Sequence, residues 1–302
     1  MKVLLTGATG FLGSHLLKKF VKSKYEVIVL KRSTSNLWRI KDVVDKVKCY
    51  DIDQVDLGQV FEKEPDIDSI VHTATCYGRG EEISTDIVQT NLLFPLELME
   101  LAVKYGCPAF FNTDTFFAKN TNKQYQYLNS YTLSKKQFLE WGKEFAAQKK
   151  IHFYNLILEH VYGEDDNPDK FIPMVIDQCM KNVDHLDLTS GEQKRDFVYV
   201  GDVAQIYDFL LQNAEIRKSY YEEFDIGTGN SIEIKEAVKI IKATTQSQTI
   251  LNFGSINYRD GEIIETNTDV TTMKKYGIDK YKMRSFKEGI QKITEINSST
   301  KK

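Results

Sequence analysis

The stretch 2-KVLLTGATGFLGSHLLKKF-20 decides the fold that we expect from this sequence. A short apolar run leads directly into Gly7, Gly10 and Gly13, and apolar residues then recur at helical spacing as far as Val21. Glycines let the chain turn tightly and approach a phosphate group, and the free N–H groups at the start of a helix attract anions. The stretch therefore predicts a strand, a phosphate-binding turn and a helix.

The same alternation continues through the first half of the chain. Further strands are predicted at 25–32, 46–53, 68–75, 108–115 and 152–163, and long helices at 86–106 and 131–149. Because the strands are almost continuously apolar, both faces of their sheet should be covered. We therefore expect an α/β fold, a Rossmann-type doubly wound parallel sheet.

The second half of the chain has a looser pattern. A helix at 171–181, paired strands around a turn within 184–200, a helix at 201–214 and a strand–turn–strand–helix unit at 222–245 are predicted. We expect residues 1–160 to form a dinucleotide-binding domain to which 196–223 return. Residues 161–195 and 224–302 should form a smaller α/β domain for the substrate.

Composition excludes several classes of protein. The net charge of the 302 residues is −3, so no nucleic-acid partner is expected. No apolar stretch is long enough to span a membrane. The four cysteines are scattered without metal-site spacing, which is typical of reduced thiols in a cytoplasmic protein.

Tyr131 and Lys135 are the strongest catalytic candidates, because they lie four positions apart in a predicted helix. A lysine one turn beyond a tyrosine places a positive charge near the phenol, which lowers the tyrosine pKa. Such a tyrosine can exchange a proton with a carbinol or carbonyl oxygen near neutral pH. An ordinary pair of helical neighbours is the alternative interpretation.

Several motifs in a fixed order resemble the extended branch of the short-chain dehydrogenase/reductase superfamily, whose members modify sugar nucleotides. Besides the glycine turn and Tyr131-x-x-x-Lys135, they are "VHTAT" (71–75), "VYG" (161–163), "GEQKRDFVYVGDVA" (191–204), "DIGTGN" (225–230) and "RDGE" (259–262). The resemblance implies a nucleotide-sugar substrate and a homodimer formed through helices 84–105 and 130–150. It also implies a catalytic set of Thr113, Tyr131 and Lys135, in which Thr113 hydrogen-bonds the reacting substrate oxygen.

The resemblance further implies a cofactor site. Its expected members are Gly7, Thr9, Gly10, Phe11, Leu12, Gly13, Arg32, Ser33, Asp51, Ile52, Thr73, Ala74, Thr75, Asn91, Tyr131, Lys135 and Leu158. The second strand ends in Lys31-Arg32-Ser33, where NAD-specific relatives usually carry an acidic residue. Cations and a hydroxyl favour a 2′-phosphate, so we expect NADP(H) to be preferred, with NAD(H) as a possible cofactor. Solvated basic residues at a strand end are the alternative.

The stretch 112-NTDTFF-117 bears on the reaction. It resembles the Ser-Thr-Asp-Glu-Val-Tyr segment of nucleotide-sugar 4,6-dehydratases, but Thr115 replaces the glutamate that serves there as base. It is more similar to the reductases that complete CDP-3,6-dideoxyhexoses, the abequose- and paratose-synthase type. Asp114 then either binds sugar hydroxyls or caps the strand. By the same resemblance, the substrate contacts are Asp114, Thr115, His160, Arg195 and Arg259.

The function expected from these residues is NADPH-dependent reduction of a 4-keto group on a nucleotide-linked deoxyhexose, with CDP as the expected nucleotide. The first alternative is a nucleotide-sugar 4-epimerase that keeps NAD bound and returns the hydride. The second is an NADP(H)-binding regulator without catalysis, against which the intact Thr113, Tyr131 and Lys135 set argues.

Overall fold

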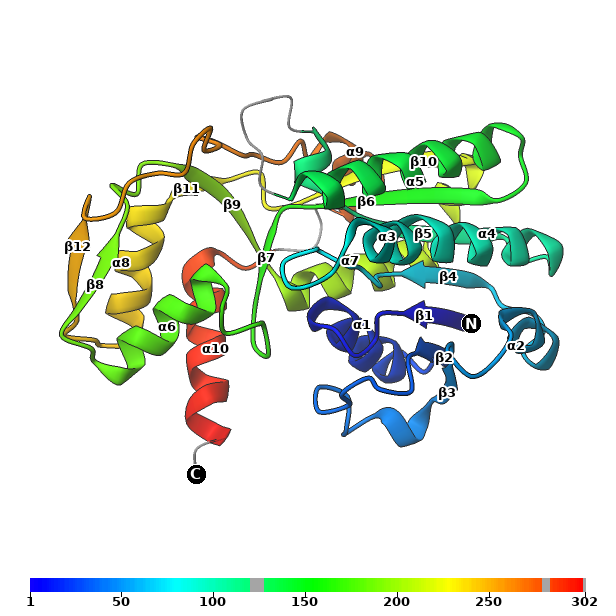
Figure 1. The fold of residues 1–302 in the computed structure, drawn as a ribbon, viewed down its shortest axis with the longest axis horizontal. Coiled ribbons are helices and arrows are strands. Elements are labelled where there is room, and N and C mark those ends of the chain that lie inside the picture. The colour runs from blue at the N-terminus through cyan, green and yellow to red at the C-terminus, as the bar shows by residue number, and fades with distance from the viewer. Residues whose placement is uncertain (120–127, 279–282, 301–302) are drawn as a thin grey trace. The chain divides into compact units, whose positions relative to one another are not determined.

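The computed structural model of the protein describes residues 1–119, 128–278 and 283–300. Its contacts divide the chain into two compact units (Figure 1). Unit 1 contains the described residues of 1–120, 127–158 and 204–224. Unit 2 contains those of 159–203 and 225–302, so the chain returns to unit 1 at Ala204, within a helix.

Unit 1 is built on a seven-stranded sheet. Its strands are β1 (Lys2–Thr6), β2 (Glu26–Lys31), β3 (Lys48–Asp51), β4 (Ser69–His72), β5 (Ala109–Thr115), β6 (His152–Leu158) and β10 (Tyr221–Ile226). They lie in the order β10-β6-β5-β4-β1-β2-β3, and the neighbours from β3 to β6 pair in parallel. Because the order reverses between β1 and β4, this is the doubly wound Rossmann arrangement, which confirms the predicted fold class.

Helices cover both faces of this sheet. They are α1 (Phe11–Lys22), α2 (Leu57–Lys63), α3 (Ser84–Val88), α4 (Phe94–Lys104), α5 (Asn129–Ala147) and α7 (Val200–Gln212). Phe110 of β5 packs on Phe138 of α5, with ring centroids 5.7 Å apart. Thr113 follows Phe110 by three residues in β5, and its hydroxyl hydrogen-bonds Tyr207 of α7. Since alternate residues of a strand face opposite sides, α5 and α7 lie on opposite faces.

The helix predicted at 86–106 is present but does not run as one α-helix. A π-helical turn, Gln89–Leu93, separates α3 from α4. Pro95 has no N–H to give the carbonyl of Asn91, and its ring would clash with that carbonyl in a regular helix. The chain widens instead, and the Phe94 N–H bonds to Gln89 O, five residues back.

Unit 2 contains two small sheets. The first consists of β7 (His160–Tyr162), β9 (Lys194–Tyr199) and β11 (Ser231–Glu233), and the second of β8 (His185–Leu188) and β12 (Ile250–Phe253). Its helices are α6 (Phe171–Lys181), α8 (Ile234–Thr244), α9 (Thr271–Lys275) and α10 (Phe286–Thr300). Short 3-10 turns at 44–46, 116–119 and 214–218 belong to unit 1. Among the described residues, no helix is long and apolar enough to cross a bilayer.

Two strand predictions were wrong in detail. The strand expected at 152–163 is divided at Glu159, whose N–H bonds to Ile226 O, so β6 and β7 join different sheets. The strands within 184–200 do not pair with each other, because β8 pairs with β12 and β9 with β7 and β11. Gly191, in the turn between them, has φ +73°, and a Cβ there would lie 2.9 Å from Lys235 N. This turn therefore packs on the start of α8 and not within a hairpin.

Candidate active site

The glycine turn after β1 is shaped for close approach. Gly10 N donates to Gly7 O over 2.9 Å, and a Cβ on Gly13 would lie 2.1 Å from the same Gly7 oxygen. Gly10 precedes α1 without any side-chain cap, so the N–H groups of the first turn are available to an anion. Thr9, Phe11 and Leu12 lie in this turn and are partly exposed.

The predicted cofactor segment at 73–75 lies directly beside the glycine turn. Gly7 has φ +71°, and a Cβ there would lie 2.6 Å from both Ala74 N and the Thr73 hydroxyl oxygen. The Thr73 hydroxyl donates to Thr6 O over 2.8 Å, and Thr75 follows in the same loop. The structure thus brings the carboxyl ends of β1 and β4 together where the strand order reverses, the place at which open α/β sheets bind ligands.

The ends of β2 and β3 contain more negative charge than the sequence argument assumed. Lys31 forms an ion pair with Asp51, and Ser33 N donates to the Asp53 carboxylate over 2.7 Å. Ile52 N donates to Lys31 O over 2.8 Å. Arg32 is exposed, and within the described part of the chain no ion pair engages its guanidinium. Of the three residues that suggested a 2′-phosphate site, Lys31 and Ser33 are thus engaged with carboxylates. The expectation of NADP(H) therefore rests on Arg32.

Thr113, Tyr131 and Lys135 lie together, but not as expected. Lys135, which is 1% exposed, donates from Nζ to the backbone oxygen of Thr113 over 2.9 Å. Tyr131 lies one turn earlier in α5 and is 5% exposed. The Thr113 hydroxyl shares a hydrogen bond of 2.7 Å with the Tyr207 hydroxyl. The side chain of β5 that lowers the pKa of the Tyr131 phenol is instead Thr115.

The electrostatics of this cluster also differ from the expectation. Burial raises the pKa of Tyr131 well above its ordinary value, and Tyr77 and Asp114 raise it further. The expected lowering by Lys135 is not seen, because the pKa of Lys135 lies below that of Tyr131, so the lysine has lost its proton before the phenol ionises. Burial lowers the pKa of Lys135 to about 8, which the Asp114 charge opposes. Lys135 is therefore still an ammonium at neutral pH.

Asp114 is an internal carboxylate. It is 3% exposed and accepts from Thr115 N over 2.8 Å and from Asn155 Nδ2 over 3.1 Å. Asn155 also receives a bond of 2.8 Å from Asn112 and donates to Glu223 over 3.2 Å. Burial raises the pKa of Asp114, while the Lys135 charge lowers it. This chain of contacts ties β5, β6 and β10 together, which favours a structural role for Asp114 over a contact with sugar hydroxyls.

Asn91 has a supporting position. Its Oδ1 accepts from Cys76 N over 2.8 Å, and its Nδ2 donates to Cys76 O over 2.8 Å and to the Ser134 hydroxyl over 3.0 Å. Ser134 in turn donates to Tyr131 O over 2.8 Å. Fully buried on the π-helical turn, Asn91 holds the loop after β4 against the start of α5. Leu158, another expected cofactor contact, ends β6 and is 8% exposed.

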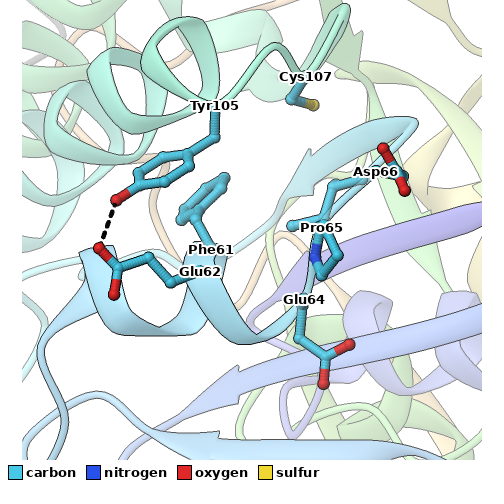
Figure 2. Close-up of a pocket in the computed structure, with 8 residues that line it drawn as sticks. Phe61, Glu62, Glu64, Pro65, Asp66, Tyr105 and Cys107 are labelled. Carbon is cyan, nitrogen blue, oxygen red and sulfur yellow. Dashed lines mark hydrogen bonds between the residues drawn. The ribbon is translucent and has the colours of Figure 1, made fainter.

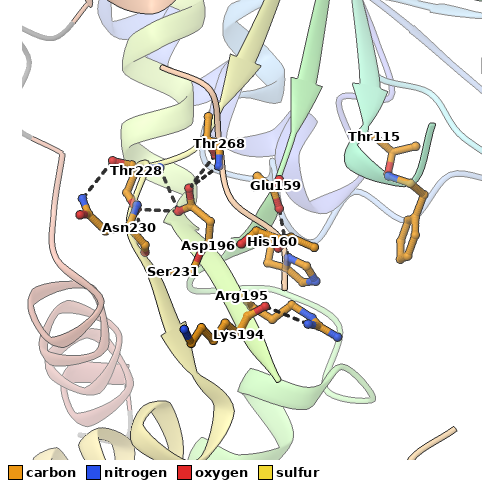
Figure 3. Close-up of polar contacts among 12 residues, drawn as sticks. Thr115, Glu159, His160, Lys194, Arg195, Asp196, Thr228, Asn230, Ser231 and Thr268 are labelled. Carbon is orange, nitrogen blue, oxygen red and sulfur yellow. Dashed lines mark hydrogen bonds and ion pairs between the residues drawn. The ribbon is translucent and has the colours of Figure 1, made fainter. Parts of the chain in front are cut away.

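In unit 2, the expected substrate residues are engaged with other side chains (Figure 3). Arg195, 7% exposed, forms an ion pair with Glu262 and donates to Lys194 O over 2.8 Å. His160 Nδ1 lies 3.4 Å from a Glu159 carboxylate oxygen. Arg259 is exposed. A diphosphate at Arg195 would therefore have to compete with Glu262.

Asp196 beside Arg195 fixes a loop. It is fully buried and accepts five hydrogen bonds, from the backbone and hydroxyl of Thr228, from Gly229 N, and from the backbone and hydroxyl of Thr268 (Figure 3). A carboxylate saturated in this way holds the 225–230 segment and the chain around Thr268 together.

Two cavities among the described residues are not lined by the predicted site residues. One, of about 280 Å³, lies at the amino ends of β4 and β5, between Phe61, Tyr105 and Cys107 (Figure 2). The other, of about 490 Å³, belongs to unit 2 and is lined by Phe197, Ile232, Met273 and their neighbours. The predicted cofactor residues gather at the carboxyl ends of the strands, away from the first cavity.

Sequence reasoning missed two residues at the site, Tyr77 and Arg79. The Tyr77 ring lies 4.9 Å from the Tyr131 ring, and the Arg79 guanidinium lies 4.8 Å above Tyr77. Both come from the loop between β4 and α3, where no periodicity or motif marks them. Only "YGR", a glycine between an aromatic and a cationic residue, was available as a signal.

The fold and the site together define a class. A Rossmann sheet with a glycine turn at its switch point, and a buried Tyr131–Lys135 pair beside the end of β5, are the features of a short-chain dehydrogenase/reductase. A Cβ on Gly7 or Gly13 would overlap backbone atoms, and Gly10 brings no side-chain cap to α1, so this tight turn fits a dinucleotide phosphate.

Comparison with known proteins identifies the family. The model of the NAD dependent epimerase/dehydratase family matches residues 3–227, and the chain belongs to this family. It is thus an NAD(P)-dependent enzyme. The chain is 38% identical to a CDP-abequose synthase of Salmonella muenchen over 91% of this chain and 92% of the relative. It is 35% identical to the CDP-abequose synthase of Salmonella typhimurium over 96% of each chain.

Solved structures agree on the fold. The UDP-glucose 4-epimerase of Thermotoga maritima, solved with UDP-glucose, superposes with a TM-score of 0.84 and 21% identity, covering the whole of both chains. At that identity the likeness describes the architecture alone.

Proposed function

We propose that the protein is an NADPH-dependent reductase of the 4-keto group of a nucleotide-linked deoxyhexose, with CDP as the nucleotide. The observation that carries the proposal is the 38% and 35% identity to two CDP-abequose synthases over nearly the whole chain. Thr115 at the position of the dehydratase base supports it, because a threonine hydroxyl is too weakly basic to remove the proton beside a ketone. The test is whether the purified protein consumes NADPH one-for-one with product when given a CDP-3,6-dideoxy-4-ketohexose.

The glycine turn, the start of α1 and the 73–75 loop would hold the dinucleotide. When bound, NADPH supplies the hydride that is added at the sugar C4. Tyr131 then donates its proton to the C4 oxygen and is reprotonated from solvent, so the carbonyl becomes an alcohol. Lys135 provides a buried ammonium one turn away, held by the Thr113 carbonyl.

The hydroxyl that orients the substrate oxygen comes from the end of β5. The family resemblance assigns this role to Thr113, whose hydroxyl is bonded to Tyr207 at 2.7 Å. Thr115, two residues further along β5, lowers the pKa of Tyr131. We therefore include both threonines in the proposed catalytic set. Arg195 and Arg259 are the proposed diphosphate contacts in unit 2, with His160 as a sugar contact.

Arg32 is proposed to select NADPH over NADH. A charge-assisted contact with the 2′-phosphate contributes about 1.5–3 kcal/mol, so Arg32→Ala should narrow the NADPH/NADH affinity ratio by roughly tenfold or more. The measurement is the dissociation constant of each cofactor for both proteins. Lys48→Ala, which removes an exposed cation paired with Glu26 and Glu64, is the matched control and should leave the ratio unchanged. Equal binding of NADH and NADPH by the unaltered protein would contradict the preference.

We also propose a homodimer formed through helices 84–105 and 130–150. Its support is a set of exposed apolar side chains on these helices, namely Val88, Leu93, Leu133 and Trp141. Light scattering should give twice the 34.8 kDa chain mass, and Leu133→Glu should reduce it to that of one chain.

A further inference from the structure

The loop between β4 and α3 places an aromatic ring and a cation over the tyrosine of the proposed site. The Tyr77 and Tyr131 ring centroids are 4.9 Å apart with an interplanar angle of 36°. The Arg79 guanidinium lies 4.8 Å from the Tyr77 ring centroid. Tyr131 is 5% exposed and Tyr77 42% exposed. Tyr77 therefore lies on the solvent side of Tyr131, with Arg79 against it.

Gly78 gives this loop its shape. Its φ is +64°, a conformation that side chains other than glycine rarely adopt, and a Cβ would lie 2.6 Å from Ile87 Cδ1. Cys76, immediately before Tyr77, is held on both backbone groups by Asn91. With this backbone conformation at Gly78, the Arg79 guanidinium lies over the ring of Tyr77. The stack is thus fixed by the bonds of Asn91 to Cys76 before it and by the left-handed conformation of Gly78 within it.

Charged and titratable groups face Tyr131 from each element packed against it. Tyr77 and Arg79 come from the loop after β4, Asp114 and the Thr115 hydroxyl from β5, and Lys135 from α5 itself. Asp114 and Tyr77 oppose ionisation of the phenol, whereas Thr115 and Arg79 favour it. Lys135 donates to the Thr113 carbonyl and has a pKa of about 8, so it is neutral when the phenol ionises. Arg79 keeps its charge there and is a cation that favours the ionised phenol.

We propose that Tyr77 and Arg79 are positioning residues for Tyr131: the Tyr77 ring fixes the phenol ring, and Arg79 supplies the positive charge that favours its ionised form. The inference rests on the proposed function, because it assigns a purpose to the reactivity of Tyr131. A guanidinium keeps its charge at every pH at which the enzyme works, so this contribution is permanent.

The test is a titration of Tyr131 that needs neither substrate nor turnover. Every tyrosine is replaced by 3-fluorotyrosine, whose phenol is more acidic, and the fluorine NMR signal of Tyr131 is identified by its loss in Tyr131→Phe. We expect Arg79→Gln to raise the pKa of this signal by about half a unit or more, the effect of one charge across partly hydrated protein. Arg79→Lys should restore most of the shift.

Lys104→Gln is the matched control, because Lys104 also lies 4.8 Å above a tyrosine ring, that of Tyr105, but at the far end of α4. It should leave the Tyr131 signal unchanged. In a protein that carries Tyr77→Leu, Arg79→Gln should raise the pKa of Tyr131 less, since the guanidinium has lost the ring against which it lies. An Arg79→Gln titration identical to that of the unaltered protein would overturn the proposal, as would an equal shift in Lys104→Gln.

Turnover measurements separate this inference from the proposed function. If the protein is a reductase, Arg79→Gln should move the pH profile of kcat to higher pH and Arg79→Lys should restore it. A protein that lacks reductase activity but shows the NMR shift would contradict the proposed function and leave the electrostatic role of Arg79 standing. A reductase without the shift would contradict the role of Arg79 alone.

Discussion

Tyr131→Phe is expected to lower turnover by a factor of at least ~10², because it removes the only proton that the proposed mechanism gives to the C4 oxygen. The substitution deletes one hydroxyl from a side chain that is 5% exposed. The ring keeps its place against Tyr77, so the shape of the site is retained. The measurement is kcat and KM for the ketosugar together with the dissociation constant of NADPH. Cofactor affinity should change little.

Tyr154→Phe is the matched control for this prediction. Tyr154 is a fully buried tyrosine of β6 whose hydroxyl donates to Ile216 O over 3.0 Å, away from α5. Its loss should cost about 1 kcal/mol of stability and leave turnover nearly unchanged. If Tyr131→Phe retained most of the activity, Tyr131 would be removed from the mechanism.

Among the glycine-to-alanine substitutions in unit 1, Gly13→Ala is expected to be the most damaging. The new Cβ would lie 2.1 Å from Gly7 O, 2.6 Å from Gly7 C and 2.9 Å from the Cα of Ala8. All three are backbone atoms, so no side-chain rotation relieves the overlap and the glycine turn must open. Overpacking of this kind costs about 3 kcal/mol, which corresponds to a loss of roughly 10²-fold in affinity for NADP(H) if it falls on the binding turn.

Calorimetric titration with NADP⁺ and a urea melt measure the two effects of Gly13→Ala. Gly106→Ala is the control, since Gly106 has φ +74° but nothing within 4 Å of the added Cβ. It should cost about 1–2 kcal/mol of stability through its backbone conformation and leave cofactor affinity intact. A Gly13→Ala protein that binds NADP⁺ like the original would mean that the turn after β1 does not hold the dinucleotide.

The sequence predicted unit 1 well because its signals are local. Apolar runs of strand length, a glycine turn and amphipathic helices recur in order, and each is decided by residues close together in the chain. The π-helical turn at 89–93 also had a local signal in Pro95, but hydrophobic spacing alone does not register one extra residue in a turn. In unit 2, the partner of β8 is β12, more than sixty residues away, and no local pattern carries such a pairing.

The site was predictable where residue identity decides chemistry and less so where orientation does. Tyr131, Lys135 and the three glycines follow from spacing. The direction of the Thr113 hydroxyl depends on Tyr207, which arrives from α7 ninety-four residues later. Asp114 could not be assigned from sequence because its partner Asn155 lies on β6, and Glu223, which also accepts from Asn155, lies on β10. Tyr77 and Arg79 were missed because the contact of Tyr77 with Tyr131 depends on how an irregular loop folds, which no local pattern indicates.

The central claim is that the protein uses NADPH as a consumed reductant. The measurement is a reaction of the purified protein with a CDP-3,6-dideoxy-4-ketohexose and stereospecifically deuterated NADPH. We predict little NAD bound to the purified protein, one NADPH oxidised per product molecule, and the deuterium at C4 of the sugar. Stoichiometric bound NAD, isomerisation of a sugar nucleotide and no net change in the nicotinamide absorbance would contradict the reductase and establish an epimerase.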